Sequence, residues 1–147
     1  MDFAYPMVQP TNTDNMARIE KTITINGTEV KMTCGNPNGK SVFKWNGFRN
    51  RFYITITING VSKRFPFYDS IARHPQSCTE GILEDCLDCC LNDAYIYENT
   101  NSLDDFMNEF GYESTKDAKQ AYNGCRKAYE FFREADFDIY KGMMHYM

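Results

Sequence analysis

Cysteine is the residue type whose spacing most readily suggests chemistry in this sequence. Cys86, Cys89 and Cys90 stand close together, with Cys78 upstream and Cys125 further along the chain. Three or four thiolates of this kind could hold a zinc ion. Cys86 and Cys90 also occupy positions where a helix needs small apolar side chains, a role that free cysteine commonly fills. We therefore expect reduced cysteines that pack in the core, and neither a metal nor a cofactor.

Residues for acid–base or nucleophilic catalysis are sparse. The histidines are His74, which precedes a proline, and His145, close to the end of the chain. Neither has a plausible serine or cysteine nucleophile beside it in sequence. The sequence also lacks a glycine-rich phosphate loop and the short motifs of zinc proteases and serine hydrolases. We expect a protein that is not an enzyme.

Basic and aromatic side chains alternate between residues 44 and 53. Platforms for single-stranded nucleic acid combine these two kinds of side chain. The same pattern suits an edge strand whose charges face water and discourage aggregation. A nucleic-acid-binding module is thus an alternative function, and its candidate residues are Lys44, Trp45, Arg49 and Arg51.

Acidic residues concentrate in one stretch of the chain. Residues 80–117 carry eleven Asp and Glu against one Lys, whereas residues 1–79 carry a net charge of +5. Acids near helix N-termini interact favourably with the helix dipole, but this explains only part of the excess. Such a surface repels phosphate and can occupy a basic groove on another protein. The expected partner-binding residues, all predicted to face solvent, are Glu84, Asp85, Asp88, Asp104, Asp105 and Glu109.

The elements that must position these residues begin with two hairpins. The six residues 22–27, Thr-Ile-Thr-Ile-Asn-Gly, recur identically as residues 55–60. Each copy alternates apolar and polar residues and ends in Asn-Gly, which favours a type I′ turn. The pattern predicts hairpins over residues 20–34 and 51–68, a turn at residues 36–39 and a short strand over residues 41–45.

From residue 77 the apolar period changes from two to about 3.6, which predicts helices. A first helix follows a capping box at residues 77–80, and its apolar stripe runs from Ile82 to Tyr95. A second, short helix begins after Ser102 and ends at Gly111. A third begins near Ser114 and contains Gly124, which weakens it locally.

Together these elements predict an α+β fold, with an antiparallel sheet of about four strands followed by three helices packed on one face. We expect a single domain over residues 1–147, divided into a loose arm (1–19), a hairpin part (20–76), a helical part (77–135) and a C-terminal tail (136–147). No apolar run is long enough to cross a bilayer, and the N-terminus does not resemble a signal peptide. We therefore expect a cytoplasmic protein that does not bind membranes.

The segment from Leu103 through Phe106, Glu109 and Phe110 to Gly111-Tyr112, followed by Ala118, Tyr122 and Cys125, resembles a group of small proteins encoded by phages, prophages and other mobile elements. In that group a sheet precedes a helix, a short Phe-rich helix that ends in Phe-Gly-Tyr, and a last helix. Such proteins include inhibitors of host defence nucleases, among them anti-CRISPR proteins, which act by binding.

The resemblance and the charge distribution together suggest a phage or mobile-element protein in the bacterial host cytoplasm. Its expected partner is a host protein with a basic groove, such as a CRISPR effector nuclease, which it would inhibit through the acidic helices. A nucleic-acid-binding module and a structural or assembly protein of a phage particle remain alternatives.

Overall fold

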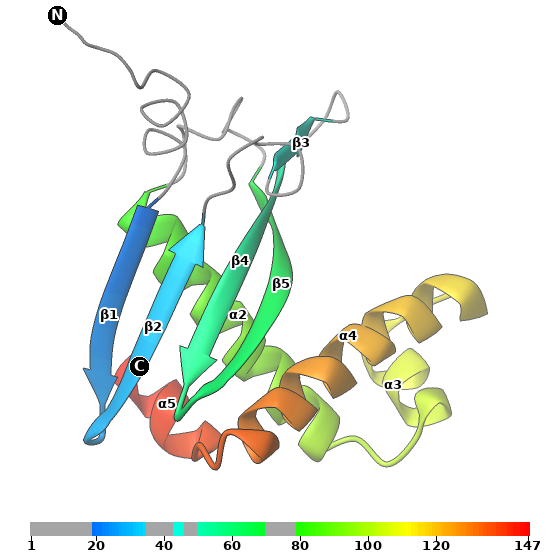
Figure 1. The fold of residues 1–147 in the computed structure, drawn as a ribbon. Helices are drawn as coiled ribbons and strands as arrows, with labels where there is room; N and C mark the ends of the chain where they lie inside the picture. The colour runs from blue at the N-terminus through cyan, green and yellow to red at the C-terminus, as the bar shows by residue number, and fades with distance from the viewer. Residues whose placement is uncertain (1–18, 35–42, 46–49, 70–78) are drawn as a thin grey trace, which may run out of the picture.

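The computed structural model describes residues 19–34, 43–45, 50–69 and 79–147. Outside these ranges lie most of the predicted arm, the predicted turn at residues 36–39, and Arg49, His74 and Cys78. The described residues form a five-stranded antiparallel sheet and four helices (Figure 1). The predicted α+β class is confirmed, with one more helix than expected.

Both predicted hairpins are present in the sheet. Asn26 and Gly27 have φ of 52° and 83°, and Asn59 and Gly60 have φ of 52° and 81°. Positive φ at both turn residues is the geometry that Asn-Gly favours. The same six residues therefore occur twice because each copy forms a strand that ends in the same type of turn. The paired strands are β1 (Ile19–Ile25) with β2 (Thr28–Cys34), and β4 (Asn50–Ile58) with β5 (Val61–Asp69).

β4 is the central strand, since β5 pairs along one side of it and β2 pairs with its second half on the other. The short strand β3 (Phe43–Trp45) pairs with the start of β4. Within the described ranges β5 pairs with no strand but β4. Pro66 of β5 stands opposite Tyr53 of β4. Hydrogen-bonded and non-hydrogen-bonded pairs alternate along the hairpin, starting with the hydrogen-bonded pair Ile58 and Val61 next to the turn, so Tyr53 and Pro66 form a non-hydrogen-bonded pair. The backbone nitrogen of Pro66 therefore faces away from β4. The missing N–H of Pro66 therefore costs no bond within the sheet.

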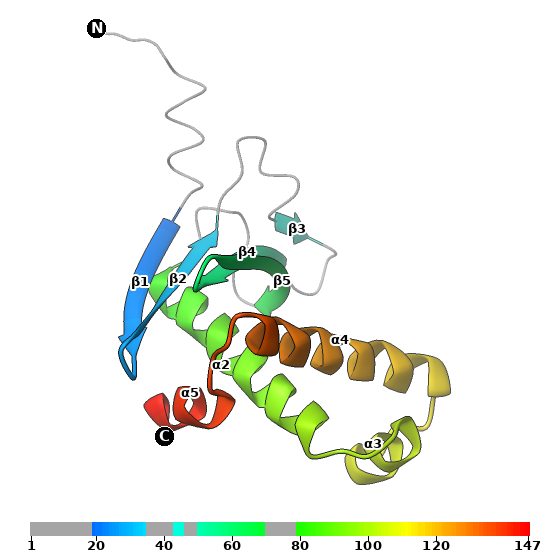
Figure 2. The ribbon, with the colours of Figure 1, turned by 60° about the horizontal axis from the view of Figure 1, so that its bottom comes forward.

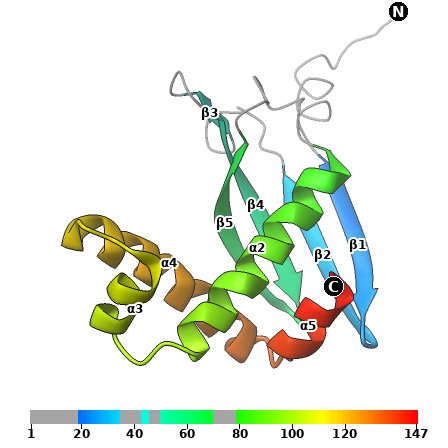
Figure 3. The same cartoon turned by 180° about the vertical axis from the view of Figure 1, so that it is seen from behind.

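Helix α2 (Glu80–Glu98) crosses one face of the sheet, as Figure 3 shows from behind. The Thr79 hydroxyl accepts a hydrogen bond from the Ile82 N–H, so Thr79 is the N-cap rather than the predicted Ser77, which lies outside the described ranges. The predicted apolar stripe is confirmed from Ile82 to Ala94. Its buried members are Ile82, Leu83, Cys86, Leu87, Cys90, Leu91 and Ala94.

Helices α3 (Leu103–Phe110) and α4 (Thr115–Glu134) begin where the sequence predicts, at N-caps Ser102 and Ser114. Gly111 ends α3 in the left-handed conformation, with φ of 69°. α4 extends past the β5 edge of the sheet, and α3 lies beside its first half (Figures 1 and 2). There Phe106, Ala118 and Cys125 form a second small core, separate from the one beneath the sheet.

The predicted C-terminal tail is in fact a fourth helix, α5 (Ile139–His145), which begins at N-cap Asp138. Phe137 and Ile139 are buried in the main core, and α5 packs on α2 and β1. A helix of seven residues with a central glycine carries too little periodicity to be predicted. Burial of its apolar residues, rather than helix propensity, holds this segment in place.

Gly142 allows α5 to approach α2 closely. A Cβ at this position would lie 2.7 Å from Leu91 Cδ2 and 2.7 Å from Phe137 Cε2, both on buried side chains. We expect Gly142→Ala to lower the free energy of unfolding by about 1–3 kcal/mol through overpacking. Urea denaturation followed by circular dichroism measures the change.

Gly124→Ala is the matched control, because a Cβ at that position in α4 meets nothing within 4 Å. We expect it to raise the free energy of unfolding by about 0.5–1 kcal/mol, the usual gain of alanine over glycine in a helix. Changes of the same sign in the two variants would contradict the close packing of α5.

Candidate functional site

The acidic residues form two separate groups. Asp85 and Asp88 lie in the first half of α2, whereas Asp104, Asp105 and Glu109 lie on α3, beyond the end of α2. The ten residues from Asp88 to the end of α2 span about 15 Å at the rise of an α-helix. In Figure 3 the start of α2 and α3 lie on opposite sides of the molecule. The predicted single acidic surface is therefore two surfaces.

Glu84 is not a free surface charge. Its Oε2 lies 2.6 Å from Nζ of Lys21 on β1, and its Oε1 accepts a hydrogen bond of 3.0 Å from the Tyr146 hydroxyl. These contacts lower the pKa of Glu84, and the hydrogen bond to Glu84 raises the pKa of Lys21. The expectation that Glu84 faces solvent is wrong, because a lysine of the sheet neutralises it and its side chain is only 25% exposed.

The α3 acids keep the expected exposure. Asp104, Asp105 and Glu109 are exposed and take part in no ion pair among the described residues. Beside them, Phe110 leaves 43% of its surface accessible, although the sequence pattern places it in the buried stripe of α3. We call these four residues the α3 surface. It combines uncompensated negative charge with an exposed aromatic ring.

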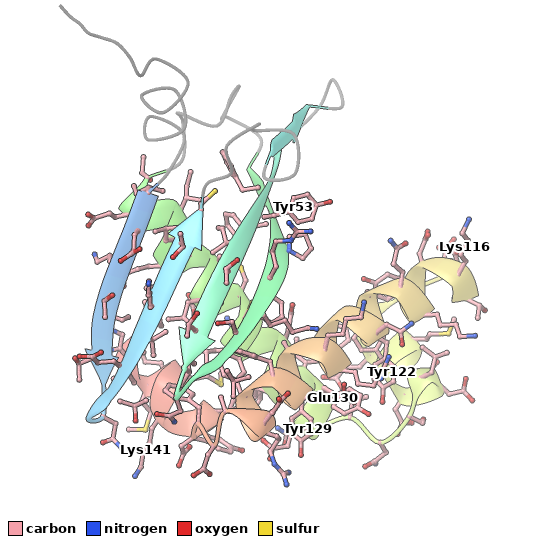
Figure 4. All side chains as sticks on the ribbon, in the orientation of Figure 1. Tyr53, Lys116, Tyr122, Tyr129, Glu130 and Lys141 are labelled. Carbon is pink, nitrogen blue, oxygen red and sulfur yellow. The ribbon has the colours of Figure 1, made fainter. Side chains whose placement is uncertain are left out.

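The basic aromatic segment is described only in part. The register places Lys44 of β3 opposite Arg51 of β4 and Trp45 opposite Asn50, while Arg49 lies outside the described ranges. Tyr53 of β4 lies against Arg64 of the neighbouring strand β5, whose guanidinium carbon is 4.9 Å from the centroid of the Tyr53 ring. Figure 4 shows Tyr53 on the sheet, away from the helices. The last residue of the predicted nucleic-acid segment, Tyr53, thus carries an arginine of β5 on its ring.

Two adjoining hollows lie between β5, α2, α3 and α4, and sequence reasoning did not predict either. The first, of about 420 Å³, has the cationic residues Lys63, Arg64 and Lys127 in its lining. The second, of about 680 Å³, is mainly apolar and aromatic; we call it the α3 hollow. Asp93 of α2 and Gly124 of α4 line both, so the two hollows meet at these residues.

Asp93 is the one residue of the α3 hollow that is charged at neutral pH. Burial raises the pKa of its carboxyl to about 6. Within the described residues it makes no hydrogen bond or ion pair. An unpaired carboxylate in a partly buried place is unfavourable unless something else satisfies it. In sequence, Asp93 was one of eleven acids and nothing marked it out.

Four of the five described cysteines occupy core positions. Cys34, Cys86, Cys90 and Cys125 are buried, as predicted for Cys86 and Cys90, whereas Cys89 is exposed. Burial raises the pKa of Cys89 to about 11 and that of Cys125 to about 12, so both are protonated thiols at neutral pH. Across the described ranges, no three His, Cys, Asp or Glu side chains come together as metal ligands would.

Comparison with protein-family models, with curated proteins and with solved structures found no match. The helices in the described part of the chain are too short or too polar to cross a membrane. The geometry of the α3 surface and the α3 hollow therefore carries the functional argument.

Asp93→Asn tests whether the Asp93 carboxylate is desolvated. A pKa raised from 3.8 to about 6 in the folded state makes folding less favourable as the pH rises through this interval. The variant should therefore gain stability relative to the parent between pH 4 and 7, reaching about 1–3 kcal/mol at pH 7. Denaturant unfolding at several pH values measures this difference.

Asp85→Asn serves as the control, since Asp85 is exposed on the outer side of α2. Its effect should stay within about 0.5 kcal/mol at every pH. A pH-independent difference between Asp93→Asn and the parent would contradict the desolvated state of Asp93.

Proposed function

We propose that this protein is a non-catalytic binding protein that recognises a basic surface of another protein through the α3 surface. The observation that carries the proposal is the juxtaposition of three exposed acids, which form no ion pair with any described residue, with the exposed ring of Phe110 on a helix that projects past the sheet. Aromatic side chains often supply the central binding energy of interfaces. Charges around them provide electrostatic steering and specificity.

The partner that we propose is a host enzyme that targets nucleic acid, such as a CRISPR effector nuclease, in the bacterial cytoplasm. Such enzymes hold phosphate backbones in positively charged channels, to which an acidic helix is complementary. The resemblance of residues 103–112 and the following helix to mobile-element proteins also supports this partner class. Inhibition would arise because the α3 surface occupies the channel that nucleic acid needs.

A cleavage assay tests this function. Purified CRISPR effector nucleases, each loaded with guide RNA, are incubated with the protein before target DNA is added. We expect inhibition of at least one effector, and we expect the triple variant Asp104→Lys, Asp105→Lys, Glu109→Lys to lose about 100-fold or more in inhibitory potency. Reversed charges repel the channel instead of attracting it, and the parental inhibition should weaken with rising salt.

The matched control reverses three exposed acids away from α3: Glu29 on β2, and Glu130 and Glu134 near the end of α4. This variant has the same net charge as the α3 variant and should inhibit as the parent does. Equal loss in both variants would reduce the effect to net charge alone. A complete lack of inhibition across the effectors would contradict the proposed partner class.

A second candidate function, binding of single-stranded nucleic acid, is favoured by the stacking of Arg64 on Tyr53. If this function operates, filter binding to a labelled oligonucleotide should show retention that falls steeply with salt, because phosphate contacts release counterions. Tyr53→Ala should then weaken binding by about 1–3 kcal/mol, the usual contribution of one stacked base. Retention unaffected by Tyr53→Ala would exclude this face of the sheet as the binding site.

A further inference from the structure

The α3 hollow has walls that suit a cation with an apolar stem. Aromatic residues line it from three segments: Phe67 on β5, Phe106 and Phe110 on α3, and Tyr112 after α3. The Phe106 ring packs against two of the others, with centroid distances of 5.0 Å to Phe110 and 5.4 Å to Tyr112. Aromatic faces attract ammonium and guanidinium groups, and they also cover methylene groups.

Asp93 adds a charge to this aromatic setting. Its carboxylate lines the hollow without any partner among the described residues, so its desolvation is uncompensated. Lys63, Arg64 and Lys127 are among the residues that line the adjoining hollow, and none of them forms an ion pair with Asp93. A positively charged group that enters the α3 hollow would therefore gain an ion pair and remove an existing cost.

Gly124 keeps the junction of the two hollows open. It lies within the 20-residue helix α4, where glycine is about 1 kcal/mol less favourable than alanine. A Cβ at this position would meet no atom within 4 Å, so the packing of this chain does not require glycine there. Any larger side chain would instead project into the space that a ligand would occupy.

From these three observations we propose that the α3 hollow binds one basic side chain, arginine or lysine, of the partner protein, with Asp93 as its counter-ion. This inference rests on the proposed function, since it supplies the anchor point of the same interface. The basic side chain enters the hollow beside Phe110, while the acids of the α3 surface contact the surrounding positive charge. The interface would thus have a buried ion pair at its centre and exposed charges at its rim.

An NMR titration tests the hollow without the partner. The full ¹⁵N-labelled chain is titrated with N-acetyl-arginine amide, N-acetyl-lysine amide and the neutral N-acetyl-norleucine amide. We expect the cationic amides to shift the amide resonances of Asp93, Ile96, Phe106 and Gly124 with a dissociation constant of about 1 mM, in the range of small ligands. Norleucine amide should bind at least about tenfold more weakly. Equal binding of norleucine amide would overturn the proposal, as would no binding by either cation.

Two variants address the same site by different means. Asp93→Asn removes the charge and keeps the shape, whereas Gly124→Leu fills the hollow and keeps the charge. Each should weaken binding of the cationic amides about tenfold or more, and circular dichroism confirms that each is folded. Asp85→Asn, on the outer side of α2, is the control that should bind as the parent does. Unchanged binding in both Asp93→Asn and Gly124→Leu would place the ligand elsewhere.

The pH dependence identifies the counter-ion. The titratable and charged residues that line the two hollows with Asp93 are Cys86, Cys89 and Cys90 on its own helix, Cys125 and Lys127 on α4, Lys63 and Arg64 on β5, and Tyr112 after α3. Burial raises the pKa of Cys89 to about 11 and that of Cys125 to about 12, so these two thiols stay neutral between pH 5 and 7.5, the interval in which Asp93 gains its charge. With a pKa of about 6, binding at pH 5 should be about tenfold weaker than at pH 7.5. Binding that does not change with pH would contradict the role of Asp93.

The cleavage assay separates this inference from the proposed function. If Asp93→Asn and Gly124→Leu inhibit as the parent does while the α3 charge-reversal variant fails, the function stands and the anchor is wrong. If the parent binds the cationic amides but inhibits none of the effectors, the hollow stands and the proposed partner class is wrong. Loss of inhibition in Asp93→Asn and Gly124→Leu, with the variant reversed at Glu29, Glu130 and Glu134 unaffected, supports both the proposed function and the anchor.

Discussion

The fold depends on the burial of one stripe of α2. Leu83, Leu87 and Leu91 have no exposed surface, because the sheet covers α2 on one side and α4 and α5 cover it on others. Each of these leucines contributes about 1.5–3 kcal/mol of burial free energy. The same helix carries Asp93 toward α4 and the Glu84 carboxylate toward β1. The position of α2 therefore sets the geometry of the core, of the internal ion pair and of the hollow.

The sequence predicts those features whose causes are local. The hairpins follow from Asn-Gly at residues 26–27 and 59–60, because the required positive φ belongs to the turn itself. The ends of α3 follow from Ser102 and Gly111, which cap it through neighbouring backbone groups. The buried stripe of α2 follows from its 3.6-residue period. None of these features needs knowledge of distant residues.

The features that sequence reasoning missed arise between distant segments. Glu84 is neutralised by Lys21, which is 63 residues away in sequence. The apolar period of α2 carries no information about this lysine, so it predicted wrongly that Glu84 faces solvent. The hollow forms where β5, α2, α3 and α4 meet, and Asp93 differs from the other acids only through that meeting. α5 is too short for its pattern to stand out, and it is held by contacts with Leu91 and Phe137 around Gly142. Tertiary packing decides each of these cases.

Pro66 makes the two edges of the sheet unequal. On the β5 side its ring replaces an outward-facing N–H, which interrupts any continuous row of hydrogen bonds with an added strand. On the β1 side the described strand has no proline, and Thr22 and Thr24 present their backbone groups outward. Among the described residues, strand addition is therefore less favourable along β5 than along β1. The proline thus limits growth of the sheet at the β5 edge.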